Sequence, residues 1–253
     1  MTHDIPVIYE DEHIIAVNKP ARIASVPSEG IPLHRTILGM FQKQCEAQGK
    51  EFVPYLLHRL DMQTSGVLLF GKHERDREQL EAILTKKDTH KKYLALVRGI
   101  PRGHAITAKL KARTSDVKIF AQTLYKVIRV YKLLGTAASL VEAEIKTGRK
   151  HQIRQHFADI KCPVVMDGEY GDFAFNRRFR VAFRLGRQFL HSSSLEFAHP
   201  LLGKIVKIEA PLSTDLEMTL QKMVDPKILA PKRDFIETMK RSNPRRENFR
   251  KRR

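Results

Sequence analysis

The chain has 253 residues and an apolar content of 42%, enough to build the core of one large domain or two small ones. Its formal net charge of +18 is unusual and indicates a polyanionic partner, with nucleic acid ahead of an acidic membrane surface. No apolar run approaches the ~20 residues that span a bilayer, and the acidic N-terminus is unlike a secretion signal. The two distant cysteines, Cys45 and Cys162, exclude a disulfide framework, so we expect a cytoplasmic protein that binds RNA or DNA.

The first part of the chain predicts short strands interrupted by two helices. Too few residues precede the first strand for an N-terminal RNA-binding module, so none is expected. The apolar spacing of four residues that is typical of a helix occurs twice, and β-branched and aromatic runs bounded by turns mark the strands. The predicted strands are 7–9, 14–17, 55–57 and 67–70, and the predicted helices are 35–47 and 73–87.

Strands dominate the second part. A strand over 92–98 places Tyr93 and Val97 on one face, because side chains alternate along a strand. Strands outnumber helices and most connections are short, which predicts an α+β fold with a mixed, mainly antiparallel sheet flanked by helices. Further strands are predicted within 105–146 and at 188–195 and 205–208, with helices at 150–160 and from Asp215 onward.

The positive charge is concentrated in two places. Residues 225–253 contain 11 Lys or Arg against 4 Asp or Glu, which is typical of a disordered basic arm, so residues 1–224 are expected to form the folded domain. Residues 176–187 contain five arginines interleaved with Phe179 and Phe183, which share one face if the segment is helical. This segment is an amphipathic surface helix, an RNA-contacting element, or both.

The most informative stretch is HRLDMQTSG, residues 58–66. Asp61 lies in a polar turn, beside Arg59 and just before a strand. A carboxylate in this setting can act as a nucleophile or base. It can equally cap the turn, with Gly66 supplying a positive φ, and residue chemistry alone leaves both interpretations open.

The stretch resembles the catalytic motif of the RluA-type pseudouridine synthases, and NKP at 18–20 followed by SVP at 25–27 resembles the opening of their catalytic domain. The resemblance implies the pseudouridine synthase catalytic fold, with Asp61 as the group that attacks a uridine. Tyr93, in KKYLALVRG, matches the family tyrosine that packs on the target base. Arg154, in TGRKHQIRQH, matches the arginine that pairs with the catalytic Asp, and Arg59 matches one that holds the RNA open.

The same motifs supply further residues that we assign to substrate binding alongside Arg59. They are Thr64, Ser65, Arg149, His151 and Gln152, the last two being expected to orient their loop. His151 and His156 are five residues apart and so point about 140° apart on a helix, unlike a zinc-binding pair. We therefore expect no metal, and no cofactor either, because the implied isomerisation needs neither redox chemistry nor an activated water.

The implied activity is isomerisation of specific uridines in structured RNA, either large-subunit ribosomal RNA, transfer RNA or both. The uracil is detached from C1′, rotated and rejoined through C5. Attack of Asp61 on C1′, attack on C6, and a glycal route all remain open. Because a paired uridine must leave its stack, a loop or stem-loop is the expected target, and we expect the protein to act as a monomer.

Two other classes of function stay open. A non-catalytic RNA-binding or ribosome-assembly protein could use the same fold. A nuclease or glycosidase would need paired carboxylates or a metal cluster, and neither is evident in the sequence.

Overall fold

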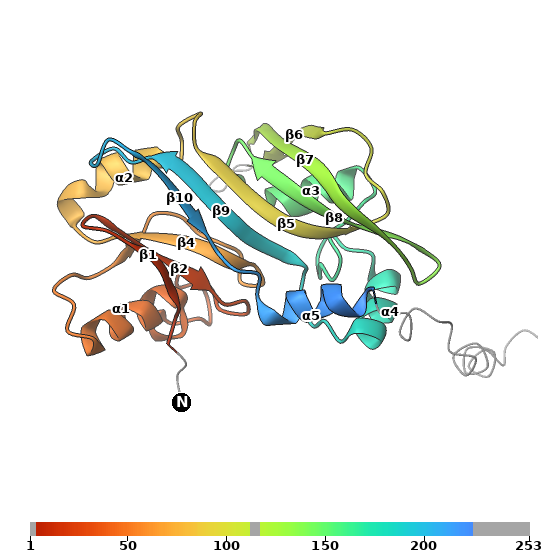
Figure 1. Cartoon of the computed structure of the whole chain (residues 1–253), viewed down its shortest axis with the longest axis horizontal. Coiled ribbons are helices and arrows are strands. Elements are labelled where there is room, and N and C mark those ends of the chain that lie inside the picture. The colour runs from red at the N-terminus through yellow and green to blue at the C-terminus, as the bar shows by residue number, and fades with distance from the viewer. Residues whose placement is uncertain (1–3, 112–116, 225–253) are drawn as a thin grey trace, which may run out of the picture.

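The computed structural model describes residues 4–111 and 117–224, so the basic extension predicted over 225–253 lies outside the described residues. The described chain forms one sheet of ten strands with five α-helices around it (Figure 1). No helix within these residues is both long and apolar enough to cross a membrane. The strands are β1 Val7–Glu10, β2 Ile14–Lys19, β3 Tyr55–Leu56, β4 Ser65–Gly71, β5 His90–Arg98, β6 Ala105–Lys111, β7 Lys118–Leu133, β8 Thr136–Ile145, β9 Leu190–Ala198 and β10 Ile205–Glu209.

The sheet has the order β1-β2-β4-β9-β5-β8-β7-β6, with β3 beside β4 and β10 beside β9. Among the described strands every pairing is antiparallel except β4 with β9. That parallel contact is short, joining Ser65 to His191 and Gly66 to Ser192. The prediction of a mixed, mainly antiparallel sheet is therefore confirmed, and the parallel contact is the seam between its two halves.

Helices cover both faces of this sheet. Helix α1 (Ile37–Ala47) and helix α3 (Gln152–Asp159) contribute to one large apolar cluster with β2, β4, β5 and β8. Helix α2 (Arg77–Ile83) packs on the opposite face over β4, β9 and β10. Helices α4 (Phe173–Phe183) and α5 (Thr214–Lys222) close the same face further along, against β7 and β8.

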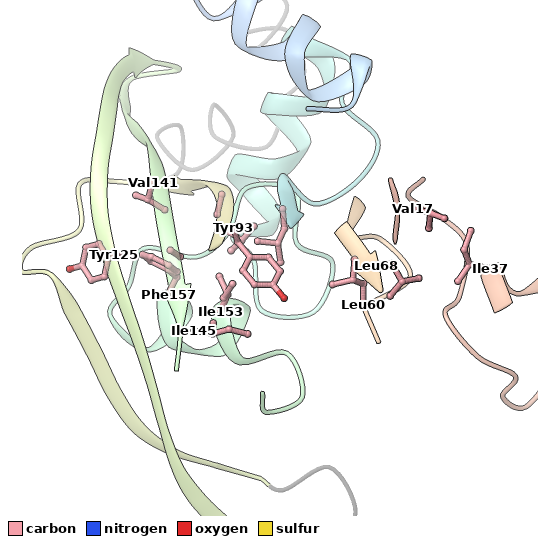
Figure 2. Packing of buried hydrophobic residues seen from close by; sticks show 14 of the residues in the cluster. Val17, Ile37, Leu60, Leu68, Tyr93, Tyr125, Val141, Ile145, Ile153 and Phe157 are labelled. Atoms are coloured by element: carbon pink, nitrogen blue, oxygen red, sulfur yellow. The ribbon is translucent and has the colours of Figure 1, made fainter. Parts of the chain in front are cut away.

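Tyr93 connects the two parts of the large cluster. Figure 2 shows its ring between the side chains of Ile153 and Phe157 from α3 and those of Leu60 and Leu68 beside β4. An aromatic ring placed there packs along its body while its hydroxyl stays near the surface. The end of β5 therefore approaches both the segment that carries Asp61 and the helix that carries Arg154.

Two local predictions were wrong. The helix expected over 73–87 begins at Arg77, after a 3₁₀ turn, and ends at Ile83, whose carbonyl accepts a hydrogen bond from the Thr89 hydroxyl. The strand predicted at 55–57 would have pointed Arg59 and Asp61 the same way only if it had continued to Asp61. Strand β3 instead ends at Leu56, and the backbone N–H of Thr64 donates to the carbonyl of Asp61 at 3.0 Å in a turn.

Candidate active site

The turn that carries Asp61 is anchored from below by a buried lysine. The Lys19 ammonium donates to the carbonyl oxygens of Pro20 at 2.8 Å, Thr64 at 2.9 Å and Met62 at 3.4 Å. Burial, together with the nearby Arg187 guanidinium, lowers the pKa of Lys19 to about 7, whereas Asp61 opposes this shift. The Met62 carbonyl also accepts from the backbone N–H of Arg22 at 2.7 Å, so the backbone of the turn is held by both Lys19 and Arg22.

Two further contacts hold the ends of the turn. Ser25 exchanges hydrogen bonds with the backbone of Leu60, accepting from its N–H at 3.0 Å and donating to its carbonyl at 2.6 Å. At the other end, Gly66 has φ +112°, and a Cβ there would lie 2.1 Å from the carbonyl oxygen of Ser192. Only glycine allows β4 to approach β9 so closely. The positive φ at Gly66 is as predicted, but Asp61 itself projects into a cavity.

Arg154 is the centre of the charged groups around Asp61. Its Nη1 donates to Asp61 Oδ2 at 3.3 Å, so the two residues meet as the resemblance implied. Its Nε and Nη2 donate to both carboxylate oxygens of Asp167, at 2.6 and 3.0 Å, and Nη2 also reaches Glu169 at 3.2 Å. A bidentate pair of this kind fixes the plane of the guanidinium. Asp167 therefore holds the arginine, and the arginine presents its remaining nitrogen to Asp61.

Asp167 is wholly buried, and its hydrogen-bond partners offset the cost of removing its carboxylate from water. Burial raises the pKa of its carboxyl, but the hydrogen bonds from Arg154 and from the backbone N–H groups of Tyr170 and Glu169 outweigh burial and leave it below the ordinary value. Asp61 differs, since its side chain is 29% exposed. The site thus contains an inner carboxylate whose ionised form is stabilised by its partners and an outer one that is accessible from the cavity.

His151 lies on the other side of Asp61. It has φ 53° and precedes α3, and its Nε2 is 3.7 Å from Asp61 Oδ1. Its Nδ1 is 3.2 Å from the Tyr170 hydroxyl and 3.3 Å from Glu169. Burial lowers the pKa of His151 against the opposing effect of Asp61, so the ring is neutral near pH 7. Asp61 is therefore flanked by a permanent cation on one oxygen and a neutral ring near the other.

Two connected hollows meet at Asp61. The larger has a volume of about 540 Å³, and its lining includes Arg59, Asp61, His151 and Arg154. The smaller, of about 80 Å³, shares these four residues and adds Tyr93 to its lining. Asp61 and Tyr93 thus line the same hollow, and Asp61 also lines the larger one.

The structure places the remaining predicted binding residues differently. Arg59 is exposed and Arg149 is half-buried, and both line the smaller hollow. Thr64 is buried and accepts from Gln188 at 2.9 Å, although it still lines the smaller hollow. Gln152 is also buried, and its amide joins the loop before α3 to Gln122 and Thr123 of β7, which agrees with an orienting role.

Ser65 requires a correction. We expected it to bind substrate, but its side chain has no exposed surface, and its hydroxyl contacts His191 Nδ1 at 2.9 Å and accepts from Arg187 at 3.1 Å. Arg187 in turn pairs with Asp215 at 2.7 and 2.9 Å. The hydroxyl therefore belongs to the seam between β4 and β9, where it contacts the buried ring of His191.

Sequence reasoning missed four charged residues of this region: Lys19, Asp167, Glu169 and Arg187. Lys19 stood within the NKP stretch but received no role of its own. The signal for the two acids was the stretch MDGEYGD over 166–172, an acidic turn in a strongly basic chain. Arg154 therefore contacts three carboxylates, those of Asp61, Asp167 and Glu169, a cluster that was not evident in the sequence.

The two histidines considered as metal ligands lie in different environments. His156 is fully buried and its Nδ1 contacts Thr123 Oγ1 at 2.9 Å, whereas His151 faces Asp61. Within residues 4–111 and 117–224, no three His, Cys, Asp or Glu side chains gather as metal ligands would. The expected absence of a metal stays a prediction.

Comparison with known proteins places this geometry in context. A family model described as RNA pseudouridylate synthase matches residues 13–159. The chain is 36% identical over 230 residues to ribosomal large subunit pseudouridine synthase C of Escherichia coli, covering 86% of this chain and 69% of that protein. It is 33% identical over 232 residues to tRNA pseudouridine synthase C of Vibrio cholerae, covering 82% of this chain and 91% of that protein.

Solved structures agree at the level of the fold. The human RNA pseudouridylate synthase domain containing 4 superposes with a TM-score of 0.69 at 19% identity, over 86% of this chain and 92% of that one. The human RNA pseudouridylate synthase domain containing 1 gives a TM-score of 0.67 at 21% identity, over 96% and 97%. At these identities the likeness concerns the backbone arrangement alone.

Proposed function

The chain belongs to the RluA-type family of RNA pseudouridine synthases, and from that premise we propose that Asp61 is the nucleophile with which it isomerises uridines in ribosomal or transfer RNA. The observation that carries the proposal is the ion pair between Asp61 and Arg154, two residues 93 positions apart that meet at the junction of two hollows. The two named relatives act on different RNAs, so both substrate classes belong to the proposal.

The geometry supports a division of labour between the two oxygens of Asp61. Arg154 holds Oδ2 at 3.3 Å and favours the ionised form, since a nearby cation stabilises the carboxylate. Oδ1 lies 3.7 Å from the neutral ring of His151, which leaves it available for chemistry. Attack on C1′, attack on C6 of the base and the glycal route would all use this oxygen.

Tyr93 supports the proposal as the base platform. Its ring is held between α3 and the Leu60 segment, so its position does not depend on a ligand. A uracil beside it would be held while its glycosidic bond is broken and the base is turned to present C5. The C5 proton must then leave, and the Tyr93 hydroxyl at the hollow is placed to take part in that transfer.

The remaining parts of the proposal concern access. A uridine in a helix must leave its stack to reach Asp61, which costs a few kcal/mol and least in a loop. Arg59 is exposed at the rim and matches the residue that holds RNA open in the family, so we assign it that role here. We also propose that the protein works in the cytoplasm as a monomer.

The experiment replaces Asp61 with Ala in the full chain and measures pseudouridine in RNA from cells that lack the gene. Asp61→Ala should keep the fold and the RNA affinity and abolish turnover. The matched control is Asp88→Ala, which removes an exposed carboxylate from the turn after α2 and should retain activity. Turnover retained by Asp61→Ala would refute the assignment of the nucleophile.

The product separates this function from the alternatives. One observation favours a glycosidase: the exposed carboxylate of Glu169 contacts the same arginine as Asp61, in addition to the buried carboxylate of Asp167. A glycosidase would release free uracil, whereas isomerisation conserves every atom of the nucleotide except the exchanged C5 proton. RNA labelled with tritium at C5 should therefore release tritium to water without free uracil. A non-catalytic RNA-binding protein would release neither.

A further inference from the structure

Helix α4 is amphipathic: its phenylalanines are buried and its arginines are mostly exposed. Phe175, Phe179 and Phe183 are buried in the cluster below the helix. Arg177, Arg180 and Arg184 recur every three or four residues on the opposite side, and all three are exposed. The spacing of three places Arg177 and Arg180 on one face of the helix, and Arg184 ends this row of exposed arginines at the C-terminal end of the helix, where it has φ 59°. The helix thus packs as the amphipathic helix that its sequence suggested, and its exposed basic face is compatible with the second interpretation, an RNA-contacting element.

The charge of this row is not neutralised by the described part of the protein. None of the three guanidinium groups forms an ion pair or hydrogen bond with a residue in 4–111 or 117–224. The acid at the start of the helix, Asp172, is paired instead with Arg98 at 3.0 Å. By contrast, Arg187, just beyond the helix, is buried and paired with Asp215. The row therefore presents free positive charge, which attracts an anion.

The row reaches the cavity of Asp61. Arg180 lines the 540 Å³ hollow together with Arg59 and Gly186. Arg22, which is exposed, lies next to this lining: its Nη2 is 2.6 Å from where a Cβ on Gly186 would stand, so a side chain at position 186 would displace it. Like the row, the guanidinium groups of Arg22 and Arg59 have no ion-pair partner among the described residues. Three segments far apart in sequence each place an uncompensated arginine around one opening.

We propose that Arg22 and the row Arg177, Arg180 and Arg184 bind the RNA phosphates that adjoin the extruded uridine. The inference rests on the proposed function, because a uridine in the hollow brings its own 5′ and 3′ phosphates to the rim. Guanidinium groups match phosphate oxygens in geometry as well as charge. Phe173, exposed one turn before Arg177, adds an aromatic surface beside the row. Arginines interleaved with an exposed aromatic fit a nucleic acid strand better than an acidic protein surface.

The test removes the row and measures RNA binding without turnover. Arg177→Gln, Arg180→Gln and Arg184→Gln are combined in the full chain that also carries Asp61→Asn. The control combines Lys43→Gln, Lys86→Gln and Lys204→Gln, which removes three exposed charges from segments that do not line the hollow. The probe is a fluorescein-labelled RNA stem-loop with uridines in its loop, followed by anisotropy at several salt concentrations.

Losing three phosphate contacts should lower the slope of log K against log salt by about 2 to 3. The affinity at 0.1 M salt should fall at least about tenfold, while the control should change it by less than about threefold because distant charges are screened. Equal effects of the two triple variants would overturn the proposal. So would an unchanged RNA slope accompanied by lost binding to vesicles of anionic lipid, which would assign the row to a membrane.

The outcome is independent of the catalytic assignment. Binding is measured in an Asp61→Asn background, so it does not depend on whether Asp61 is the nucleophile. The tritium-release assay with Asp61 intact reports the function separately. A row variant that binds RNA normally but shows lower Tm than its control would also count against the proposal, because exposed arginines on a packed helix should not affect folding.

Discussion

Replacing Arg154 with Met tests which carboxylate the arginine serves. The substitution leaves Asp167 buried without its bidentate partner, whereas Asp61, 29% exposed, can turn to water. Breaking a buried pair by removing one partner costs about 3–5 kcal/mol, while an exposed pair contributes about 0.2–1 kcal/mol. We therefore expect Arg154→Met to lower the free energy of unfolding by about 3–5 kcal/mol, nearly all of it through Asp167. For a chain of this size, that corresponds to a Tm lower by roughly 6–20 °C.

Two double-mutant cycles resolve the two contributions by urea unfolding. The cycle of Arg154→Met with Asp167→Asn should give a coupling of about 3 kcal/mol, because the second change removes the stranded charge. The cycle with Asp61→Asn should give less than about 1 kcal/mol. A larger coupling with Asp61 than with Asp167 would refute the reasoning and would make the catalytic carboxylate the structural partner.

The pH dependence offers a second check on the same pair. In the native protein the pKa of Asp167 lies below its ordinary value, so its unfolded form binds protons first as the pH falls. The stabilisation is therefore complete above the ordinary carboxyl pKa of about 3.9 and is lost as the pH falls through the native value. In Arg154→Met this stabilisation is gone, so the difference between the two proteins should narrow in acid. A difference that stays constant below pH 4 would contradict the linkage.

Three other substitutions have outcomes set by single residues. Burial lowers the pKa of Lys19 to about 7, so between pH 7 and about 10 the unfolded form binds more protons than the native form. The free energy of unfolding should therefore rise as the pH is raised through this range. Urea titrations should show this rise in the native sequence and not in Lys19→Met. Burial lowers the pKa of His191 to about 4, so native stability should fall between pH 6.5 and 4, and His191→Gln should lack that fall. Gly66→Ala places a Cβ 2.1 Å from the Ser192 carbonyl oxygen, so it should lower the free energy of unfolding by more than about 2 kcal/mol. The measurement would show a lower Tm or no folded protein. A variant as stable as the native chain would show that β4 can move away from β9.

The fold was predictable where burial follows a regular period. Ile37, Phe41 and Cys45 recur every fourth residue, and all three are buried on α1. The helix over 73–87 was predicted too long because its charged residues are compatible with either a helix or a turn; at Ile83 the carbonyl accepts from the Lys86 N–H and the Thr89 hydroxyl, and the helix ends there. Periodicity shows which face is buried, but it does not show where a hydrogen bond stops a helix.

The site was predictable only in part, for a physical reason. The resemblance of two motifs to those of the family predicted that Asp61 and Arg154 would be in contact, although they lie 93 residues apart in the sequence. The sequence does not distinguish a buried charged side chain from an exposed one. The residues around Asp167 and Lys19 therefore did not indicate that both side chains are buried. Ser65 was misassigned for the converse reason, since a hydroxyl within a catalytic motif can face the interior as readily as the ligand.

The short parallel seam between β4 and β9 has a consequence for the order in which the protein matures. Ser65 pairs with a residue 126 positions later, and the adjoining Arg187 needs Asp215. A nascent chain that has reached His156 already contains Asp61, Tyr93 and Arg154. It still lacks β9, the strand that lies between β4 and β5 and joins the two halves of the sheet. Pairings this distant form late, because loop closure must precede them. We therefore expect RNA-modifying competence to emerge only when α5 has left the ribosome, and a fragment cut after the last motif to stay inert.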